Sequence, residues 1–174
     1  PLCLVFAFAV LALSVSRASA QVESLKMPLV EEEKVDYYLA YPGVLPDHFL
    51  YPIKMIRDRI WLFLTTNEID KTKLLLLYAD KRLGAAKALI EGGKKELGLK
   101  TLTKSQQYLQ RAAVQLKDLN KECELGEQVY KASLKHGEIM LGFEGKLDQE
   151  SQKLLNENIG YARRVQEELL PFVN

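Results

Sequence analysis

The sequence predicts an all-α protein: a bundle of about four to five amphipathic helices in antiparallel hairpins, preceded by an irregular segment rich in proline and aromatic residues. Three observations lead to this prediction. After Pro52 the next proline is Pro171, so the long interval between them lacks the strongest helix breaker. Apolar residues in that interval recur at alternating spacings of three and four, the period of one helix face. No useful length of sequence shows the alternating pattern of a strand.

The irregular segment covers residues 37–52. Its aromatic residues are interleaved with turn formers: Tyr37, Tyr38, Tyr41, Phe49 and Tyr51 among Pro42, Gly43, Pro46 and Pro52. Proline and glycine favour turns, whereas aromatic rings gain free energy on leaving water. We therefore expect this segment to pack on the helices with its rings buried.

The first two helices are predicted at residues 52–64 and 68–91. Pro52 can occupy the first turn of the earlier helix, where a missing N–H does no harm. One face of this helix carries Ile53, Ile56, Ile60 and Phe63 or Leu64, and we expect it to face the other helices. The later helix begins after Asn67 as N-cap and stops at Gly92-Gly93. Its apolar stripe is Leu76, Ala79, Leu83, Ala86 and Ile90.

Three further helices are predicted at residues 99–123, 126–143 and 148–170. The apolar stripe of the first is Leu102, Leu109, Ala112, Leu116, Leu119 and Cys123. That of the second is Val129, Ala132, His136, Ile139 and Phe143. That of the third is Leu154, Leu155, Ala162, Val165 and Leu169. Short connections at 92–95 and near 145 favour antiparallel neighbours, and the stripe spacing suits coiled-coil-like packing. Gly126 either separates two helices or lies within one longer, bent helix.

The N-terminal residues predict export. An apolar run from Leu2 to Val15 is followed by Ala18-Ser19-Ala20, the layout of a signal peptide over residues 1–20, N-terminally incomplete because the chain opens with proline. The alternative is a retained anchor, but the run is shorter than the roughly 18 residues that span a bilayer. Cleavage after Ala20 would leave a solvated leader at 21–40 and a single helical domain at 41–174. We expect a periplasmic, cell-surface or extracellular protein.

Charge and cysteine content exclude several classes of function. The chain has 24 basic and 23 acidic residues, and Arg17 lies in the expected signal peptide. Without a basic excess we expect no nucleic-acid partner and, after cleavage, no membrane contact. Cys3 would be removed with the signal, so Cys123 cannot form an internal disulfide. We expect Cys123 to act as a small apolar residue, with an intermolecular disulfide as the alternative.

Two stretches carry a family resemblance. They are YPGVLPDHFLYPIKMIRDRIWLFLT at residues 41–65 and KLLLLYADKRLGAAKALIEGGK at 73–94. A third stretch, KASLKHGEIM at 131–140, is less specific. The sequence over about residues 41–165 resembles the bacterial family called domain of unknown function 5667. The resemblance implies an exported helical domain and carries over no catalytic or ligand-binding residue.

The sequence offers no motif for catalysis or cofactor binding. His48 and His136 are distant and unpaired, whereas zinc sites usually combine closely spaced ligands. His136 lies in an apolar stripe, so we expect a core histidine with a hydrogen-bond partner, for which Asn158 is the candidate. No activated nucleophile or phosphate-binding glycine loop is present. We therefore expect no catalytic, cofactor-binding or metal-binding residue and no enzyme activity.

Three charged residues lie within the two distinctive stretches. Arg57, Asp80 and Arg82 fall at the borders of the apolar stripes. We expect them to form ion pairs that fix how the helices at 52–64 and 68–91 meet, and a polar recognition site is the alternative.

These observations favour a non-catalytic binding or structural module in the cell envelope or outside the cell, with a protein as its expected partner. A periplasmic chaperone-like or small-ligand-sensing role is the alternative, and an enzyme is the less favoured one.

Overall fold

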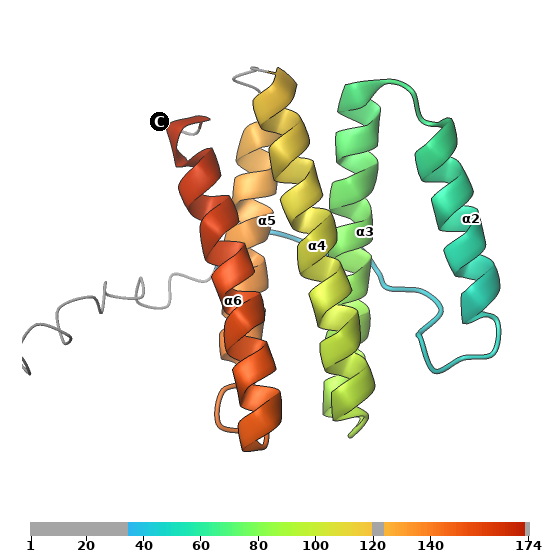
Figure 1. Ribbon diagram of the computed structural model, residues 1–174, viewed down its shortest axis with the longest axis vertical. Coiled ribbons are helices and arrows are strands. Elements are labelled where there is room, and N and C mark those ends of the chain that lie inside the picture. The colour runs from blue at the N-terminus through green and yellow to red at the C-terminus, as the bar shows by residue number, and fades with distance from the viewer. Residues whose placement is uncertain (1–34, 120–123, 173–174) are drawn as a thin grey trace, which may run out of the picture. The chain divides into compact units, whose positions relative to one another are not determined.

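The computed structural model describes residues 35–119 and 124–172. Five α-helices and a short 3-10 helix lie in these ranges: α2 (Tyr51–Leu64), α3 (Glu68–Glu91), α4 (Lys95–Leu119), α5 (Glu124–Leu141), α6 (Gln149–Leu169) and η1 (Leu170–Phe172). Helices α3 to α6 form a bundle, and α2 lies beyond α3 at its edge (Figure 1). The predicted all-α helical bundle is confirmed. The expected signal peptide, most of the leader and Cys123 lie outside the described residues.

The helix ends follow from local capping. Helix α3 has the predicted bounds, because the Asn67 side chain accepts hydrogen bonds from the backbone N–H groups of Ile69 and Asp70 at 3.0 and 3.1 Å. The chain leaves α3 through Gly93, whose φ of 82° is costly for other residues. Asp148 caps α6 as predicted, accepting from the N–H of Ser151.

Helices α4 and α5 differ from the prediction in their bounds. Helix α4 begins at Lys95 instead of residue 99, and α5 begins at Glu124. Gly126 therefore lies buried in the first turn of α5 and does not itself end a helix. The two-helix alternative is the one that the structure adopts.

The core consists of two apolar clusters along the bundle. The antiparallel pair α3/α4 makes its largest interface, and α6 packs equally on α4 and α5. The first cluster includes Leu76, Leu109 and Val129, and the second includes Leu83, Leu102 and Leu155. Every residue of the predicted stripe on α3 is buried, so the helical periodicity identified this core face correctly. Between the clusters lies a layer of buried polar side chains.

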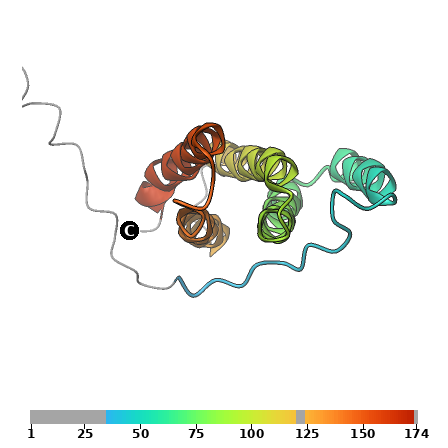
Figure 2. The same cartoon turned by 90° about the horizontal axis from the view of Figure 1, so that it is seen from below.

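Residues 35–50 form a strap that crosses the bundle before reaching α2 (Figure 2). The N–H of Val35 donates to Glu138 of α5 at 3.1 Å, and further along Pro42 lies against Gly84 of α3. The strap is therefore docked, as predicted. Val35, the first described residue, lies within the segment that the sequence assigned to the leader.

The rings of the strap are not buried as expected. Tyr37 and Leu39 pack against the two core clusters, whereas Tyr38, Tyr41 and Phe49 are exposed. Successive side chains of an extended chain point to opposite sides, which explains the exposure of Tyr38 between Tyr37 and Leu39. The expectation of general ring burial was wrong for Tyr38, Tyr41 and Phe49.

No helix within the described ranges combines the length and the apolar character needed to cross a bilayer.

Candidate functional site

The apolar face of α2 points away from the bundle. We define this face by the exposed side chains of Ile53, Ile56, Ile60, Phe63 and Leu64. Ile56 is 59% exposed and Phe63 86%. The sequence placed this stripe against the other helices, and that prediction was wrong.

The opposite face of α2 meets α3, and its contacts explain the orientation. Asp58 is the only buried residue of α2, and its backbone carbonyl accepts a hydrogen bond from the Tyr78 hydroxyl at 3.2 Å. Met55 Sδ lies 3.3 Å from Nη2 of Arg82, and Leu62 packs against the first core cluster. Helix α3 already directs its own apolar stripe to the bundle core, so its remaining surface offers α2 polar and aromatic partners.

Basic side chains border the apolar face of α2. A helix turns by about 100° per residue, which places Arg57 beyond one edge of the face and Arg59 beyond the other. Arg57 is bonded to Asp58 at 2.8 Å, and this hydrogen bond raises the pKa of its guanidinium. Lys54 donates instead to the carbonyls of Pro42 and Val44 in the strap. The apolar face thus has a cationic margin.

The predicted boundary ion pairs among Arg57, Asp80 and Arg82 do not form. Arg57 pairs with its neighbour Asp58, which was not foreseen. Arg82 is buried, with its guanidinium 4.2 Å from the centre of the Tyr108 ring and 5.5 Å from that of Tyr78. A cation can rest on the negative face of an aromatic ring. Arg82 therefore joins α2, α3 and α4 through sulfur and aromatic contacts.

Asp80 belongs to the buried polar layer, together with His136 and Gln106. The Gln106 amide nitrogen lies 3.2 Å from His136 Nδ1, and His136 Nε2 lies 3.1 Å from Asp80 Oδ1. If the Gln106 amide donates to Nδ1, the Nε2–H of a neutral imidazole donates to Asp80. His136 is wholly buried, so the prediction of a hydrogen-bonded core histidine is confirmed.

The partner predicted for His136 was wrong. Asn158 donates to Thr103 and to the carbonyl of Leu154, within α4 and α6. Asp80 and Gln106 take the place assigned to it, because both lie at the same level of the bundle as His136. His48, the other histidine, is exposed before α2, where its Nδ1 accepts from the N–H of Leu50.

The strap covers the polar layer on one side. The hydroxyl of Tyr37 donates to Oδ2 of Asp80 at 2.7 Å. Burial raises the pKa of this phenol, and the nearby Asp80 carboxylate raises it further. Tyr37, Asp80, His136 and Gln106 thus form an internal hydrogen-bond network that connects the strap with α3, α5 and α4.

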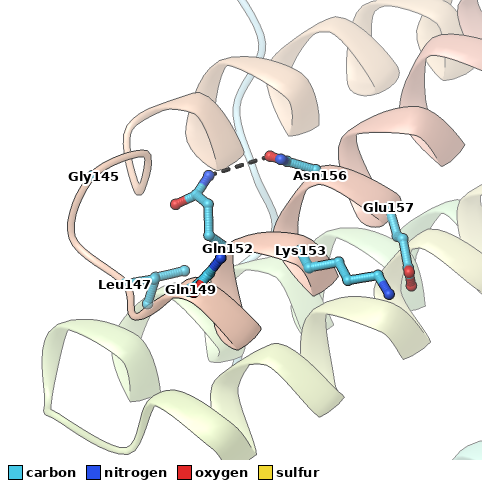
Figure 3. A pocket seen from close by; sticks show the side chains of 7 residues that line it. All are labelled: Gly145, Leu147, Gln149, Gln152, Lys153, Asn156 and Glu157. Carbon is cyan, nitrogen blue, oxygen red and sulfur yellow. Dashed lines mark hydrogen bonds between the residues drawn. The ribbon is translucent and has the colours of Figure 1, made fainter.

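A shallow depression lies at the end of the α5/α6 hairpin (Figure 3). It has a volume of about 740 Å³ and is lined by Gly145, Leu147, Gln149, Gln152, Lys153, Asn156 and Glu157. All of these residues are exposed or half-buried. The Gln152 amide donates to Asn156 instead of converging on the hollow. The depression therefore lacks the enclosed lining of mostly hydrophobic side chains that a typical ligand site has.

Comparison with known proteins gives one match. A family model described as Domain of unknown function (DUF5667) matches residues 43–160. Neither the curated proteins nor the solved structures contain a match. The matched range includes α2, its apolar face and the polar layer.

Proposed function

Since the chain belongs to the family Domain of unknown function (DUF5667), we propose a function from its own geometry: a non-catalytic, exported binding module that attaches through the apolar face of α2. The component that it binds belongs to the cell envelope or to the extracellular space. The observation that carries the proposal is the exposure of five large apolar side chains along one side of a single helix.

Physical chemistry supports a binding role for such a face. Contiguous exposed apolar surface is uncommon on soluble proteins and commonly marks an interaction site. Anchors at Ile53, Ile56 and Ile60 have the three- and four-residue spacing of helices that bind through one side. Burying each such side chain against a partner would contribute about 1.5–3 kcal/mol.

The proposal of a non-catalytic role follows from the surroundings of the acid–base groups. His136 and Asp80 are the pair best suited to proton transfer, yet both are buried and hydrogen-bonded to neighbours. A general base must come within hydrogen-bond reach of its substrate. Tyr37 and the helices surrounding this pair keep a substrate at a greater distance.

Export is the part of the proposal that rests on the N-terminal sequence. Cleavage after Ala20 would release a chain that begins at Gln21. Intact-mass measurement of the chain recovered from the producing cell's envelope should show this terminus or its cyclised form. Recovery of the whole chain from the cytoplasm, with residues 1–20 attached, would contradict export.

Cell fractionation tests the binding role of α2. We expect the wild-type chain to accompany the envelope fraction, and the double variant Ile56→Gln, Ile60→Gln to be released from it. Val114→Gln is the matched control, because Val114 is an apolar residue of α4, 46% exposed, that does not belong to the apolar face of α2. Equal envelope association of the wild type and both variants would contradict the proposal.

A chaperone-like role is the second candidate. The strap carries further exposed rings, those of Tyr38, Tyr41 and Phe49. A protein of this kind should suppress the aggregation of an unfolded client. If it does so equally well with Ile56 and Ile60 replaced by glutamine, the rings and not α2 form the binding surface.

A further inference from the structure

We propose that the component bound by α2 is an anionic lipid surface, on which α2 lies parallel to the plane of the membrane. The apolar face would enter the boundary between headgroups and acyl chains, and the bundle would remain in water. This inference rests on the proposed function and names the partner of the same surface.

The position of α2 suits a flat partner. Helix α2 is the outermost helix, at the edge of the row in the end view (Figure 2). Its contact with α3 uses the side carrying Met55 and Asp58, so the apolar face is directed away from the bundle. A convex face of this kind can meet a plane along its whole length.

The dimensions of α2 favour lying on a bilayer over spanning it. Its 14 residues extend about 21 Å at 1.5 Å per residue. The hydrocarbon core of a bilayer is about 30 Å thick. The five apolar side chains occupy an arc of about 100° in helical projection, which is the width of the buried stripe of an amphipathic helix.

The side chains around this face match the chemistry of a lipid boundary. Isoleucine, phenylalanine and leucine occupy its centre, and the exposed ring of Trp61 lies at one margin. Tryptophan prefers the headgroup level, where its apolar ring and its polar N–H are both accommodated. Helices that lie in the interface combine such an apolar face with basic residues at its edges.

The margin of the face indicates that the lipid is anionic. Arg59 is exposed on one border, where its guanidinium group can donate paired hydrogen bonds to phosphate oxygens. Arg57, on the other border, already donates to Asp58 through Nε and Nη2. Asp58, the acidic residue of α2, is buried on the other side. The same charges disfavour a second copy of the chain as occupant, because packing two such faces together would bring arginines close to one another.

This inference departs from the expectation of no membrane contact. That expectation considered the charge of the whole chain, in which basic and acidic residues balance. The structure buries the acidic group of α2 and pairs it with Arg57, and it leaves the exposed Arg59 beside the apolar face. A helix lying on a surface requires only this local arrangement.

Trp61 gives a direct test because it is the single tryptophan of the chain. Its fluorescence reports on α2 even when other segments of the full chain contact lipid. Vesicles containing equal amounts of phosphatidylglycerol and phosphatidylcholine should shift the emission to shorter wavelength and reduce quenching by iodide. Pure phosphatidylcholine vesicles should have at least about ten-fold weaker affinity, and added salt should weaken binding to the anionic vesicles.

Variants separate the apolar contribution from the charged one. Ile56→Gln with Ile60→Gln should lower the affinity for anionic vesicles by at least about ten-fold, whereas Val114→Gln should leave it unchanged. Arg59→Gln should reduce the preference for anionic over neutral vesicles, and Lys153→Gln on α6 should not. Circular dichroism of each variant confirms that the bundle is folded before binding is compared.

The outcomes distinguish this inference from the proposed function. An unchanged Trp61 spectrum with anionic vesicles, or equal affinity for neutral ones, would overturn the lipid assignment. If envelope attachment still depended on Ile56 and Ile60, the binding role would stand and the partner would be a protein. Self-association abolished by the same double variant, without vesicle binding, would overturn the assignment in favour of a second copy.

Discussion

His136 connects three helices at one level of the bundle. It lies on α5, while its hydrogen-bond partners Asp80 and Gln106 lie on α3 and α4. A buried carboxylate is costly unless its hydrogen bonds are satisfied. Asp80 meets this requirement through His136 on one oxygen and Tyr37 on the other. The polar layer therefore fixes which helices and which part of the strap meet at this level.

Replacing this histidine should destabilise the bundle. His136→Ala leaves a cavity and removes a hydrogen bond from a buried carboxylate, so we expect the free energy of unfolding to fall by about 2–4 kcal/mol. His48→Ala is the matched control, with an expected change within about 0.5 kcal/mol because His48 is exposed. Urea denaturation measures the change in the free energy of unfolding for both variants. Equal effects of the two substitutions would contradict the assignment of His136 to the core.

Tyr37 should contribute to stability in a pH-dependent manner. Burial and Asp80 raise its pKa in the folded state, whereas a tyrosine in the unfolded chain titrates near about pH 10. The folded state therefore holds this proton more tightly, and the contribution is complete below the unfolded pKa. It decreases as the pH rises from there toward the folded pKa.

The corresponding measurement compares wild type with Tyr37→Phe. We expect the wild type to be the more stable at pH 8, and its advantage in melting temperature to shrink above about pH 10. Tyr38→Phe serves as the control because that ring is exposed and should give no such trend. A difference between wild type and Tyr37→Phe that stays constant up to strongly alkaline pH would refute the role given to the phenol.

For single residues, the sequence predicted whether a side chain is buried better than it predicted the hydrogen-bond partners of that side chain. The apolar stripe around His136 correctly indicated a core position. Its neighbours could not be identified, because the choice between Asn158 and Asp80 depends on the vertical register of four helices. Arg82 was placed at a boundary for a related reason: its burial depends on Tyr108 and Met55, which belong to other elements.

At the scale of helices, local signals were sufficient for most bounds. Asn67, Gly93 and Asp148 define helix ends through interactions with the adjoining few residues, so the sequence contains that information. The orientation of α2 is different, because both of its faces contain apolar residues. Met55 and Leu62 on one side compete with the isoleucines on the other, and periodicity alone favoured the larger stripe.

The α3/α4 hairpin depends on a close approach at Gly98. A Cβ atom at this position would lie 2.6 Å from Ile90 Cγ1 and 3.1 Å from the backbone oxygen of Ala86. Gly98→Ala should therefore cost about 1–3 kcal/mol of stability, despite the higher helix propensity of alanine.

Gly160→Ala provides the contrast for this prediction. Gly160 lies inside α6, and the nearest atom to an added Cβ is the flexible Nη1 of Arg164 at 3.8 Å. This substitution should stabilise the protein by about 0.5–1 kcal/mol. Thermal melting measures the stability of both variants. A gain in stability from Gly98→Ala would contradict the close approach of α3 and α4 at this position.

At the scale of the whole molecule, the fold separates a closed core from an exposed edge. Helices α3 to α6 bury their apolar stripes around a hydrogen-bonded polar layer, and α2 contributes mainly one contact face to α3. A helix that exposes its apolar face loses the stabilisation that burial would give it. The proposed binding role compensates for this loss, and it requires that α2 directs its isoleucines outward.

The free energy of unfolding of Ile60→Gln, measured beside that of Leu83→Gln, tests this claim most directly. Both substitutions replace an aliphatic side chain by the same amide, but Ile60 is 52% exposed and Leu83 is fully buried. We expect a loss within about 0.5 kcal/mol for Ile60→Gln and about 3–5 kcal/mol for Leu83→Gln. A loss of several kcal/mol for Ile60→Gln as well would place that side chain in the core and contradict an outward apolar face.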